Sequence, residues 1–461
     1  MTAADGGGRA TLRRRSVSTA AWSLGHVAAV RGLGLAANLV MTRLLAPEAF
    51  GLMAMVVTVL TMAEMVSDIG VRQSVARSER GEDPAFLRIA WTVQVVRSAG
   101  VAGIVLAAAA GLRAFGPALA APGSVYADPA LPALVAVSAL AVLFRGGVST
   151  TLWRAERRLD IGRVTAMEIA AQAATIAAML GLALTLGASV WVLLAGLLIG
   201  DGLRMAASHL IFRDVAMAPA WDRAVAAEMW RFGRWIILSS MATFAVNTGD
   251  RFVLGALLDA EVFGLYAIAT IWLQVGVTLI DRLSGRVLFA AMAETLRERR
   301  AGFARFLARS RLLFDGALAG CFLLTLALAG PLIGLLYTDE YRGAAPILAL
   351  LSLRFLALRQ RPLQQLLVVE GRTRTVAGAT ALGALAMVAG VPLAWHWGGL
   401  GAAVAVAALA PLAAAPVTAR AVLATRPGLP VRRDALILAG VSVLAAATWW
   451  WTAPALRALG G

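Results

Sequence analysis

The sequence predicts an all-α, polytopic membrane protein, and three observations lead to this fold class. Of the 461 residues, 60% are hydrophobic and only 15% are charged, a balance unlike that of soluble domains of this length. Apolar runs of about 20 residues, long enough to cross about 30 Å of hydrocarbon as helices, recur along the chain. Arginine is concentrated in alternate gaps between these runs, as expected for loops that stay on one side of a membrane.

The apolar runs predict the transmembrane spans in order, and we expect about 12 to 14 helices. The basic start, RRRSVS, is typical of a signal peptide, but the following run is interrupted by Arg31 and has no convincing cleavage site. We therefore interpret it as an uncleaved first helix with a cytoplasmic N-terminus. In chain order the spans cover residues 21–41, 49–68, 89–110, 130–150, 164–186, 189–212, 235–257, 262–288, 312–335, 344–369, 376–395, 399–419 and 434–452.

The gaps between spans support this topology. About 28 arginines fall in segments assigned to the cytoplasm, about 4 in external segments and about 10 inside spans. The external gaps are short except for residues 111–129, which contain three prolines and predict a loop. The longest cytoplasmic gap, around 294–311, mixes charges with Phe303 and Phe306, and it fits either an interfacial amphipathic helix or a solvated loop.

A phrase between spans 1 and 2 recurs between spans 7 and 8. LLAPEAFGLMAM at 44–55 and LLDAEVFGLYAI at 257–268 share about seven of twelve letters. An interval of six helices returns the chain to the same side of the membrane, so the phrase predicts two parallel repeats related by an axis along the membrane normal. The repeat therefore predicts two parallel six-helix lobes.

Each copy of the phrase predicts a tight external helical hairpin. Pro47 suits the first turn of a helix, and Asp259 suits a helix N-cap. Gly51 and Gly264, each after a phenylalanine, predict close contact between helices.

Several functional classes are excluded or disfavoured by the composition. The net charge of +16 lies in short gaps between apolar runs and not on a polar domain, so we expect no nucleic-acid partner. Cys321 is the single cysteine, and His26, His209 and His396 are far apart, so neither a metal site nor a cofactor is expected. The sequence has no nucleotide-binding loop and no nucleophile elbow, so we expect a protein that is not an enzyme.

Several stretches resemble one family of transporters. The run MTRLLAPEAFGLMAMVVTVLTMAEMVSDIGVRQSVARSERGEDPAFLRIAWTVQ and the run NTGDRFVLGALLDAEVFGLYAIAT carry the resemblance, and LLYTDEYRGAAPILALL and GGLGAAVAVA extend it. They are similar to the Wzx-like polysaccharide flippases of the multidrug/oligosaccharidyl-lipid/polysaccharide exporter superfamily. The likeness is strongest to the branch that serves exopolysaccharide, colanic-acid and O-antigen-type lipopolysaccharide assembly.

The resemblance implies a fold, a location and a cargo. It implies two six-helix lobes around a central cavity, which we place at residues 1–225 and 226–425, with an additional C-terminal helix at 426–461. The implied activity is alternating-access flipping of undecaprenyl-diphosphate-linked oligosaccharide repeat units across the bacterial cytoplasmic (inner) membrane. The implied partners are membrane lipid and polysaccharide polymerase or export machinery.

Buried charges are candidates for binding this cargo, because a charge at the bilayer centre costs about 2.5–3.5 kcal/mol on insertion scales. Guanidinium groups suit a diphosphate through paired hydrogen bonds. Arg354 and Arg361 are seven residues apart on one helical face beside Pro362, which can bend span 10. The substrate candidates are Arg31, Arg97, Asn247, Asp250, Arg251, Arg354, Arg359 and Arg361.

Carboxylates inside the spans are candidates for ion coupling. Asp250 is one, and its alternatives are balance of a cavity arginine or a role in helix packing. Glu64, Asp68 and Glu168 are the others, although pairing with loop arginines such as Arg72 or Arg163 is the simpler expectation for them. Arg145, Arg204, Arg282 and Arg286 are expected to anchor the topology, and Asp201 and Arg204 to pair at i and i+3.

Two alternative functions remain at this point. A multidrug or cation antiporter of the same superfamily would favour an acidic cavity, and the excess of arginine inside the spans weighs against it. A membrane-embedded polysaccharide polymerase or ligase is expected to present a large external loop with basic residues, whereas the external gaps here hold only about 4 arginines.

Overall fold

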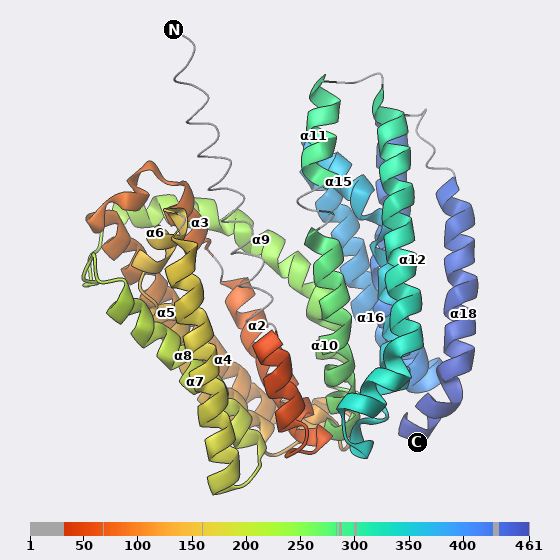
Figure 1. The fold of residues 1–461 in the computed structure, drawn as a ribbon, viewed down its shortest axis with the longest axis horizontal. Helices are drawn as coiled ribbons and strands as arrows, with labels where there is room; N and C mark the ends of the chain where they lie inside the picture. The colour runs from red at the N-terminus through yellow and green to blue at the C-terminus, as the bar shows by residue number, and fades with distance from the viewer. Residues whose placement is uncertain are drawn as a thin grey trace. The chain divides into compact units, whose positions relative to one another are not determined.

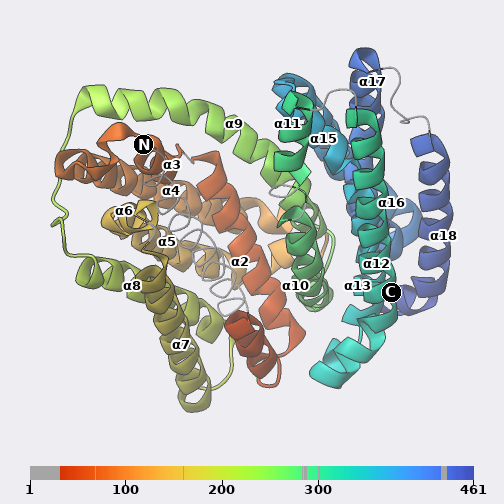
Figure 2. The same ribbon diagram turned by 45° about the horizontal axis from the view of Figure 1, so that its top comes forward.

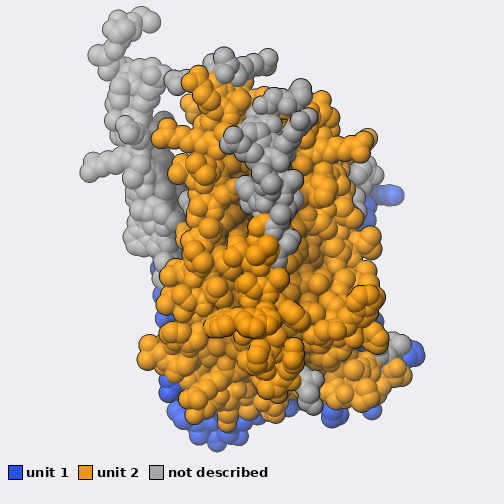
Figure 3. All heavy atoms as spheres, turned by 90° about the vertical axis from the view of Figure 1, so that its right-hand side faces the viewer, with its two compact units in different colours: residues 1–45, 59–115, 129–240 blue, residues 46–58, 116–128, 241–461 orange. Residues whose placement is uncertain are grey.

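The computed structural model describes residues 32–67, 69–158, 160–282, 284, 288–298, 302–426 and 433–460, and all the regular elements among them are helical. Figure 1 follows the helices along the chain. The fold separates into two compact units, coloured in Figure 3. Unit 1 contains residues 1–45, 59–115 and 129–240, and unit 2 contains residues 46–58, 116–128 and 241–461. The predicted all-α class is confirmed.

Unit 1 is built from long apolar helices and short connecting ones. Three helices are divided between the units: α2 at residues 58 and 59, α4 at residues 115 and 116, and α9 at residues 240 and 241. The elements that lie wholly or partly in unit 1 are α2 (Pro47–Val66), α3 (Val71–Arg77), η1 (Glu79–Glu82), α4 (Pro84–Leu119), α5 (Leu131–Gly147), α6 (Thr151–Arg157), α7 (Ile161–Leu186), α8 (Val190–Ile211) and α9 (Arg223–Leu254).

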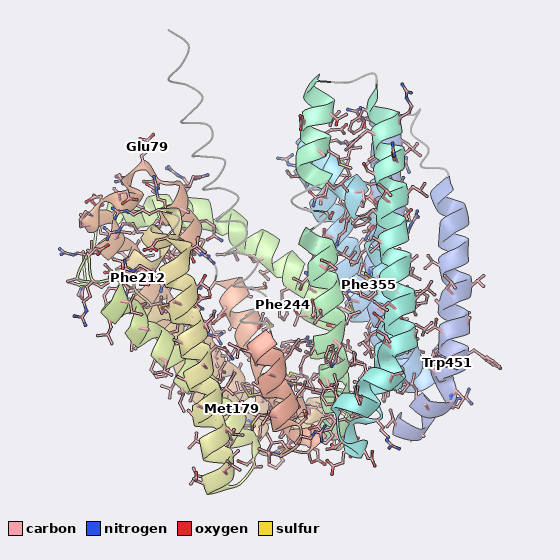
Figure 4. All side chains as sticks on the ribbon, in the orientation of Figure 1. Glu79, Met179, Phe212, Phe244, Phe355 and Trp451 are labelled. Carbon is pink, nitrogen blue, oxygen red and sulfur yellow. The ribbon has the colours of Figure 1, made fainter. Side chains whose placement is uncertain are left out.

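Unit 2 holds the remaining helices. The helices α16 and α18 pack side by side (Figures 1 and 2). The exposed side chain of Trp451 projects from α18 on the side away from α16 (Figure 4). The elements are η2 (Val125–Ala127), α10 (Ala260–Arg282), α11 (Phe289–Glu298), α12 (Phe303–Leu336), η5 (Asp339–Tyr341), α13 (Ala344–Leu351), α14 (Leu353–Ala357), η6 (Leu358–Gln360), α15 (Arg361–Val369), α16 (Thr373–Leu409), η7 (Ala410–Ala414), α17 (Ala415–Thr425) and α18 (Arg433–Gly460).

The chain is a multi-pass membrane protein. Among the described residues, eight helical segments are long and apolar enough to cross a membrane, or nine if α5 and α6 form one bent span. One of the eight, Thr373–Thr425, is 53 residues long, and its backbone leaves the helical region at Gly398 and Gly399. Gly399 has φ 61° and ψ −152°, a conformation that essentially only glycine adopts. This break confirms the predicted boundary between spans 11 and 12.

Several helices begin earlier than their apolar runs predict. α9 begins at Arg223 and α12 at Phe303, whereas the predicted spans begin at residues 235 and 312. Polar and basic residues continue a helix once it has left the hydrocarbon, because the backbone hydrogen bonds do not depend on the surrounding solvent. Hydropathy therefore predicts the part of a helix that lies in the hydrocarbon, and it does not predict the residues at which the helix begins and ends.

Two predictions about loops are wrong. The residues from 111 to 119 belong to α4, which contains Pro117, and only the rest of the segment from 111 to 129 forms a loop. That loop is hydrogen-bonded within unit 2: the N–H of Ala121 donates to Ala256 O at 3.1 Å, and the N–H of Val125 donates to Leu258 O at 2.9 Å. These backbone bonds order a connection that composition alone marks only as proline-rich.

The segment around 294–311 is also not a single interfacial helix or a solvated loop. It is divided between α11, which ends at Glu298, and α12, which begins at Phe303. Phe303 is 1% exposed and packs with Met292, Leu366 and Val422 in a core of unit 2. Its aromatic ring is therefore buried against protein, because α15 and α17 cover the face that we expected to meet lipid.

The two copies of the repeated phrase pack directly against each other in unit 2. Pro47 is the first residue of α2, and the N–H of Val262 donates to Asp259 Oδ1 at 2.8 Å, which confirms the predicted cap. A Cβ added to Gly51 would lie 2.0 Å from Ala260 O, and one added to Gly264 would lie 1.9 Å from Pro47 O. Since Pro47 and Ala260 occupy equivalent places in the two copies, the contact is reciprocal, as a two-fold relation requires.

Candidate functional site

A cavity of about 220 Å³ lies inside unit 2. It is formed by residues of α9, α14, η6, α15, α16 and η7. Its lining includes no aspartate or glutamate among the residues that the structure describes. The polar residues that line it are Asn247, Arg354, Gln360, Arg361, Gln364, Gln365 and Thr380.

The cavity lies where two stretches of regular helix are interrupted. Between α14 and α15 the backbone narrows to the 3-10 helix η6, directly before Arg361 and Pro362, and α16 passes into the 3-10 helix η7. The 3-10 segment therefore lies directly before Pro362, the residue at which the sequence predicts a bend. Irregular backbone within a membrane span is tolerated where it is buried in protein or lines a cavity, because its polar groups then find partners.

Gln360 joins the two interruptions. Its side chain is 7% exposed, and Nε2 donates to Pro411 O in η7. Its Oε1 has no hydrogen-bond partner among the described residues. A buried amide oxygen without a donor is unfavourable by about 1–3 kcal/mol, so a donor that reached this atom would relieve that cost.

Arg354 is positioned by main-chain oxygens. One guanidinium nitrogen donates to Val246 O at 2.7 Å and another to Ala407 O at 3.2 Å, and the side chain is 7% exposed. A guanidinium has five N–H groups, so these two bonds leave donors for an anion. Because carbonyl groups orient the side chain without cancelling its charge, Arg354 is a fixed positive charge on the cavity wall.

The other two arginines of span 10 differ from each other. Arg361 lines the cavity and forms an ion pair with Asp281 of α10, which is not a lining residue. Arg359 does not line the cavity, and one of its guanidinium nitrogens lies 3.0 Å from Asp315 Oδ2 on α12. Arg359 therefore contributes to packing between helices, since η6 turns it to a different side of the span.

The polar cluster of α9 faces three directions. Asn247 lines the cavity, Asp250 Oδ2 accepts a hydrogen bond of 2.5 Å from Tyr266, and Arg251 donates to Thr270 at 3.2 Å. Asp250 is 6% exposed, and its Oδ1 has no hydrogen-bond partner among the described residues. Asp250 and Arg251 thus have different partners, as their separation of about 100° around the helix predicts.

In unit 1 the candidate side chains lie within a network of ion pairs. Arg145 donates to Glu64 at 2.9 Å and to Asp201 at 2.8 Å, and so joins α5 to α2 and α8. Arg204 pairs with Glu168 at 2.6 Å. The predicted pair between Asp201 and Arg204 is therefore wrong, because each residue has a partner on another helix.

The expected loop partners of these carboxylates are also wrong. Arg72 pairs with Glu156 at 2.7 Å, and Arg163 pairs with Asp160 at 3.4 Å, so neither neutralises Glu64 or Glu168. Helices that cross a membrane bring ionic groups together at equal depth, whatever their separation in sequence.

The remaining candidates are Arg97, Arg31 and Asp68. Arg97 of α4 donates to Ser67 Oγ at 3.1 Å in unit 1. Arg31 and Asp68 lie outside the described residues. Within unit 2, the structure brings together three of the predicted substrate candidates, Asn247, Arg354 and Arg361, around one cavity.

Sequence reasoning missed the amide side chains of this cavity. Gln360, Gln364 and Gln365 follow one another in the stretch RQRPLQQ, inside an apolar span where polar amides are expensive to bury. The stretch APLAAAP, with its two prolines, marks the second interruption. Both signals were available in the sequence, because interrupted spans in transporters often border a binding site.

Comparison with known proteins identifies the family. Residues 40–346, more than half of the chain, match the family model described as "Polysaccharide biosynthesis protein". The chain belongs to this family. The resemblance to polysaccharide flippases of the multidrug/oligosaccharidyl-lipid/polysaccharide exporter superfamily is thereby confirmed.

Two curated proteins are similar to this member of the polysaccharide biosynthesis family. The lipopolysaccharide biosynthesis protein WzxC of Escherichia coli (strain K12) is 24% identical over 78% of the chain and 71% of its own length. The succinoglycan biosynthesis transport protein ExoT of Rhizobium meliloti (strain 1021) is 25% identical over 72% of the chain and 64% of its own length. The chain therefore spans about two thirds of each relative.

Solved structures share the fold. The lipid II flippase MurJ in an inward closed conformation has a TM-score of 0.63 and 13% identity, with 94% of this chain and 92% of that chain covered. An inward-facing multidrug resistance MATE family transporter has a TM-score of 0.60 and 12% identity, with 93% and 94% covered. This polysaccharide biosynthesis protein thus has the fold of these membrane proteins.

Proposed function

We propose that the protein moves undecaprenyl-diphosphate-linked oligosaccharide repeat units from the cytoplasmic to the external leaflet of the bacterial inner membrane. The movement would occur by alternating access, with the N-terminus in the cytoplasm, and would supply exopolysaccharide or O-antigen-type assembly. Polysaccharide polymerase or export machinery would receive the product. The family assignment supports a role in polysaccharide biosynthesis, and the fold shared with a lipid II flippase supports a lipid-linked cargo.

The observation that carries this proposal is the charge of the unit 2 cavity. Arg354 and Arg361 line it, and none of its described lining residues is acidic. A diphosphate with two or more negative charges suits such a wall, since guanidinium groups donate paired hydrogen bonds to phosphate oxygens. A multidrug or cation antiporter would favour an acidic wall, so the same observation weighs against that alternative.

Deletion of the gene followed by leaflet-resolved analysis of lipid-linked repeat units tests the function. We expect labelled units to accumulate on the cytoplasmic leaflet and to disappear from the outer face. Complementation with the intact chain is expected to restore them. Normal appearance of the units on the outer face in the deletion strain would rule out the flippase assignment.

Arg354→Ala is expected to lower export about 10- to 100-fold at normal protein level. A hydrogen bond to a charged group contributes about 1.5–3 kcal/mol, and about 1.4 kcal/mol corresponds to a factor of ten. Export is measured as repeat units on the outer face per unit of membrane protein. Arg342→Ala is the matched control, because the Arg342 side chain is 72% exposed and pairs only locally with Asp339. Wild-type export by the Arg354 variant would contradict the cavity assignment.

Asp250 is the coupling residue that we favour, since Glu64 and Glu168 are already paired with arginines. Asp250→Asn retains the shape of the side chain but cannot carry a negative charge to hold a proton or cation. We expect at least about a tenfold loss of gradient-driven export in vesicles at unchanged folding, on the scale of one charge-assisted interaction. Glu261→Gln, at an exposed position of α10, serves as the control. Undiminished gradient-driven export by the Asp250 variant would show that coupling lies elsewhere.

A further inference from the structure

The cavity in unit 2 offers amide groups as well as positive charge. Four amide side chains, those of Asn247, Gln360, Gln364 and Gln365, share its lining with the two arginines. Amides both donate and accept hydrogen bonds, which matches the hydroxyl groups of a sugar, whereas a site for phosphate alone needs only donors. No described lining residue is acidic, so Arg354 meets no carboxylate from the wall, whereas Arg361 is paired with Asp281 behind it.

The side-chain oxygen Oε1 of Gln360 lacks a hydrogen-bond donor in the described part of the chain, and this indicates which chemical group a ligand must supply. Nε2 is held by Pro411 O, so the amide is oriented and Oε1 is fixed as an acceptor. The residue is more than nine-tenths buried and lines the cavity, and Oε1 has no partner among the described residues. The phosphate groups of a diphosphate-linked sugar cannot satisfy it, because they carry no P–OH at neutral pH and offer only acceptors. A hydroxyl group can.

The volume limits the ligand. A cavity of about 220 Å³ is below the roughly 300–1,000 Å³ of sites for drug-sized ligands, so it cannot enclose an oligosaccharide. It is of a size for one sugar ring with part of an attached phosphate. Arg354 and Gln360 are both lining residues of this cavity.

We propose that this cavity is a subsite for a single sugar 1-phosphate unit, in which Arg354 binds the phosphate and Gln360 Oε1 accepts a sugar hydroxyl. The identity of the natural ligand, the sugar next to the diphosphate of the lipid-linked cargo, rests on the proposed function. The subsite itself is a property of unit 2 and binds a soluble sugar phosphate without transport.

The test uses the purified full-length protein in phosphatidylcholine nanodiscs. Dissociation constants are obtained from ligand-induced thermal stabilisation, which rises with the ratio of free ligand to Kd. The probes are the 1-phosphates of glucose, galactose, mannose and N-acetylglucosamine, together with inorganic phosphate and free glucose. We expect at least one sugar 1-phosphate to bind about 5-fold or more tightly than inorganic phosphate, the scale of one neutral hydrogen bond.

Two variants on different helices test whether the cavity binds the sugar ring as well as the phosphate. Gln360→Met and Asn247→Leu are each expected to weaken the preferred sugar 1-phosphate about 5- to 10-fold and to leave the affinity for inorganic phosphate unchanged. Gln274→Met, at an exposed position of α10, is the matched control and is expected to bind as the wild type does. A variant that changed sugar phosphate and inorganic phosphate equally would indicate a structural effect and overturn the proposal.

Two further outcomes would also overturn it. Equal affinity for inorganic phosphate and every sugar phosphate would leave a plain anion site. Competition by phosphatidylglycerol nanodiscs as strong as that by free sugar phosphate would assign the site to a phospholipid headgroup. These results are separable from the proposed function, since a deletion strain with normal outer-leaflet units refutes transport whether or not the purified protein binds a sugar phosphate.

Discussion

Gly51→Ala and Gly264→Ala are each expected to destabilise the protein by about 3 kcal/mol or more and to lower its accumulation in the membrane. A Cβ at either position would lie about 2 Å from a carbonyl oxygen of the opposite copy of the phrase, at Ala260 or Pro47. A main-chain atom cannot rotate away as a side chain does, so the two helices must separate, and overpacking of this kind costs about 1–3 kcal/mol or more. Thermal unfolding of the purified protein in detergent measures the effect.

The reciprocal contact between Gly51 and Gly264 also predicts how the double variant behaves. One widening of the crossing accommodates both new methyl groups, so the double variant is expected to lose less stability than the sum of the single variants. Gly320→Ala on α12 is the control, because a Cβ there meets nothing within 4 Å. Helix propensity alone favours alanine over glycine by about 1 kcal/mol. Wild-type unfolding temperatures for both single variants would refute the close crossing.

Arg145→Met is expected to destabilise the protein by about 3 kcal/mol. The guanidinium of Arg145 pairs with both Glu64 and Asp201, which come from α2 and α8, and its loss leaves these two carboxylates without that partner in unit 1. Removal of one partner from a buried ionic group typically costs about 3–5 kcal/mol, and we take the lower end because the Arg145 side chain is 34% exposed. The measurement is again thermal unfolding, with Arg342→Met as the control.

Rescue separates lost charge balance from lost packing. Adding Glu64→Gln and Asp201→Asn to the Arg145 variant removes the unpaired charges and is expected to recover most of the stability. If the triple variant were no more stable than the single one, the role of Arg145 would be packing and not neutralisation.

The positions of the spans follow closely from the sequence. The runs at 49–68 and 164–186 correspond to α2 and α7, and the boundary expected near 395–399 is the break at Gly398 and Gly399. Hydrophobic length locates these helices well, because the thickness of the bilayer sets the length of a span. The recurrence of Gly51 and Gly264 likewise predicted a close contact, although not that the two glycines pack against each other's helix.

The partners of the charged residues required the tertiary structure. Arg354 and Arg359 belong to one span and looked equivalent in sequence, yet Arg354 of α14 lines the cavity and Arg359 of η6 pairs with Asp315. Glu64 and Asp201 are held by Arg145 from a third helix, and Gln360 by the carbonyl of Pro411. The sequence by itself determined that these polar groups must be satisfied inside a membrane. Only the packing of helices distant in sequence decided which groups satisfy them, because partners within a bundle are set by depth and facing direction and not by separation along the chain.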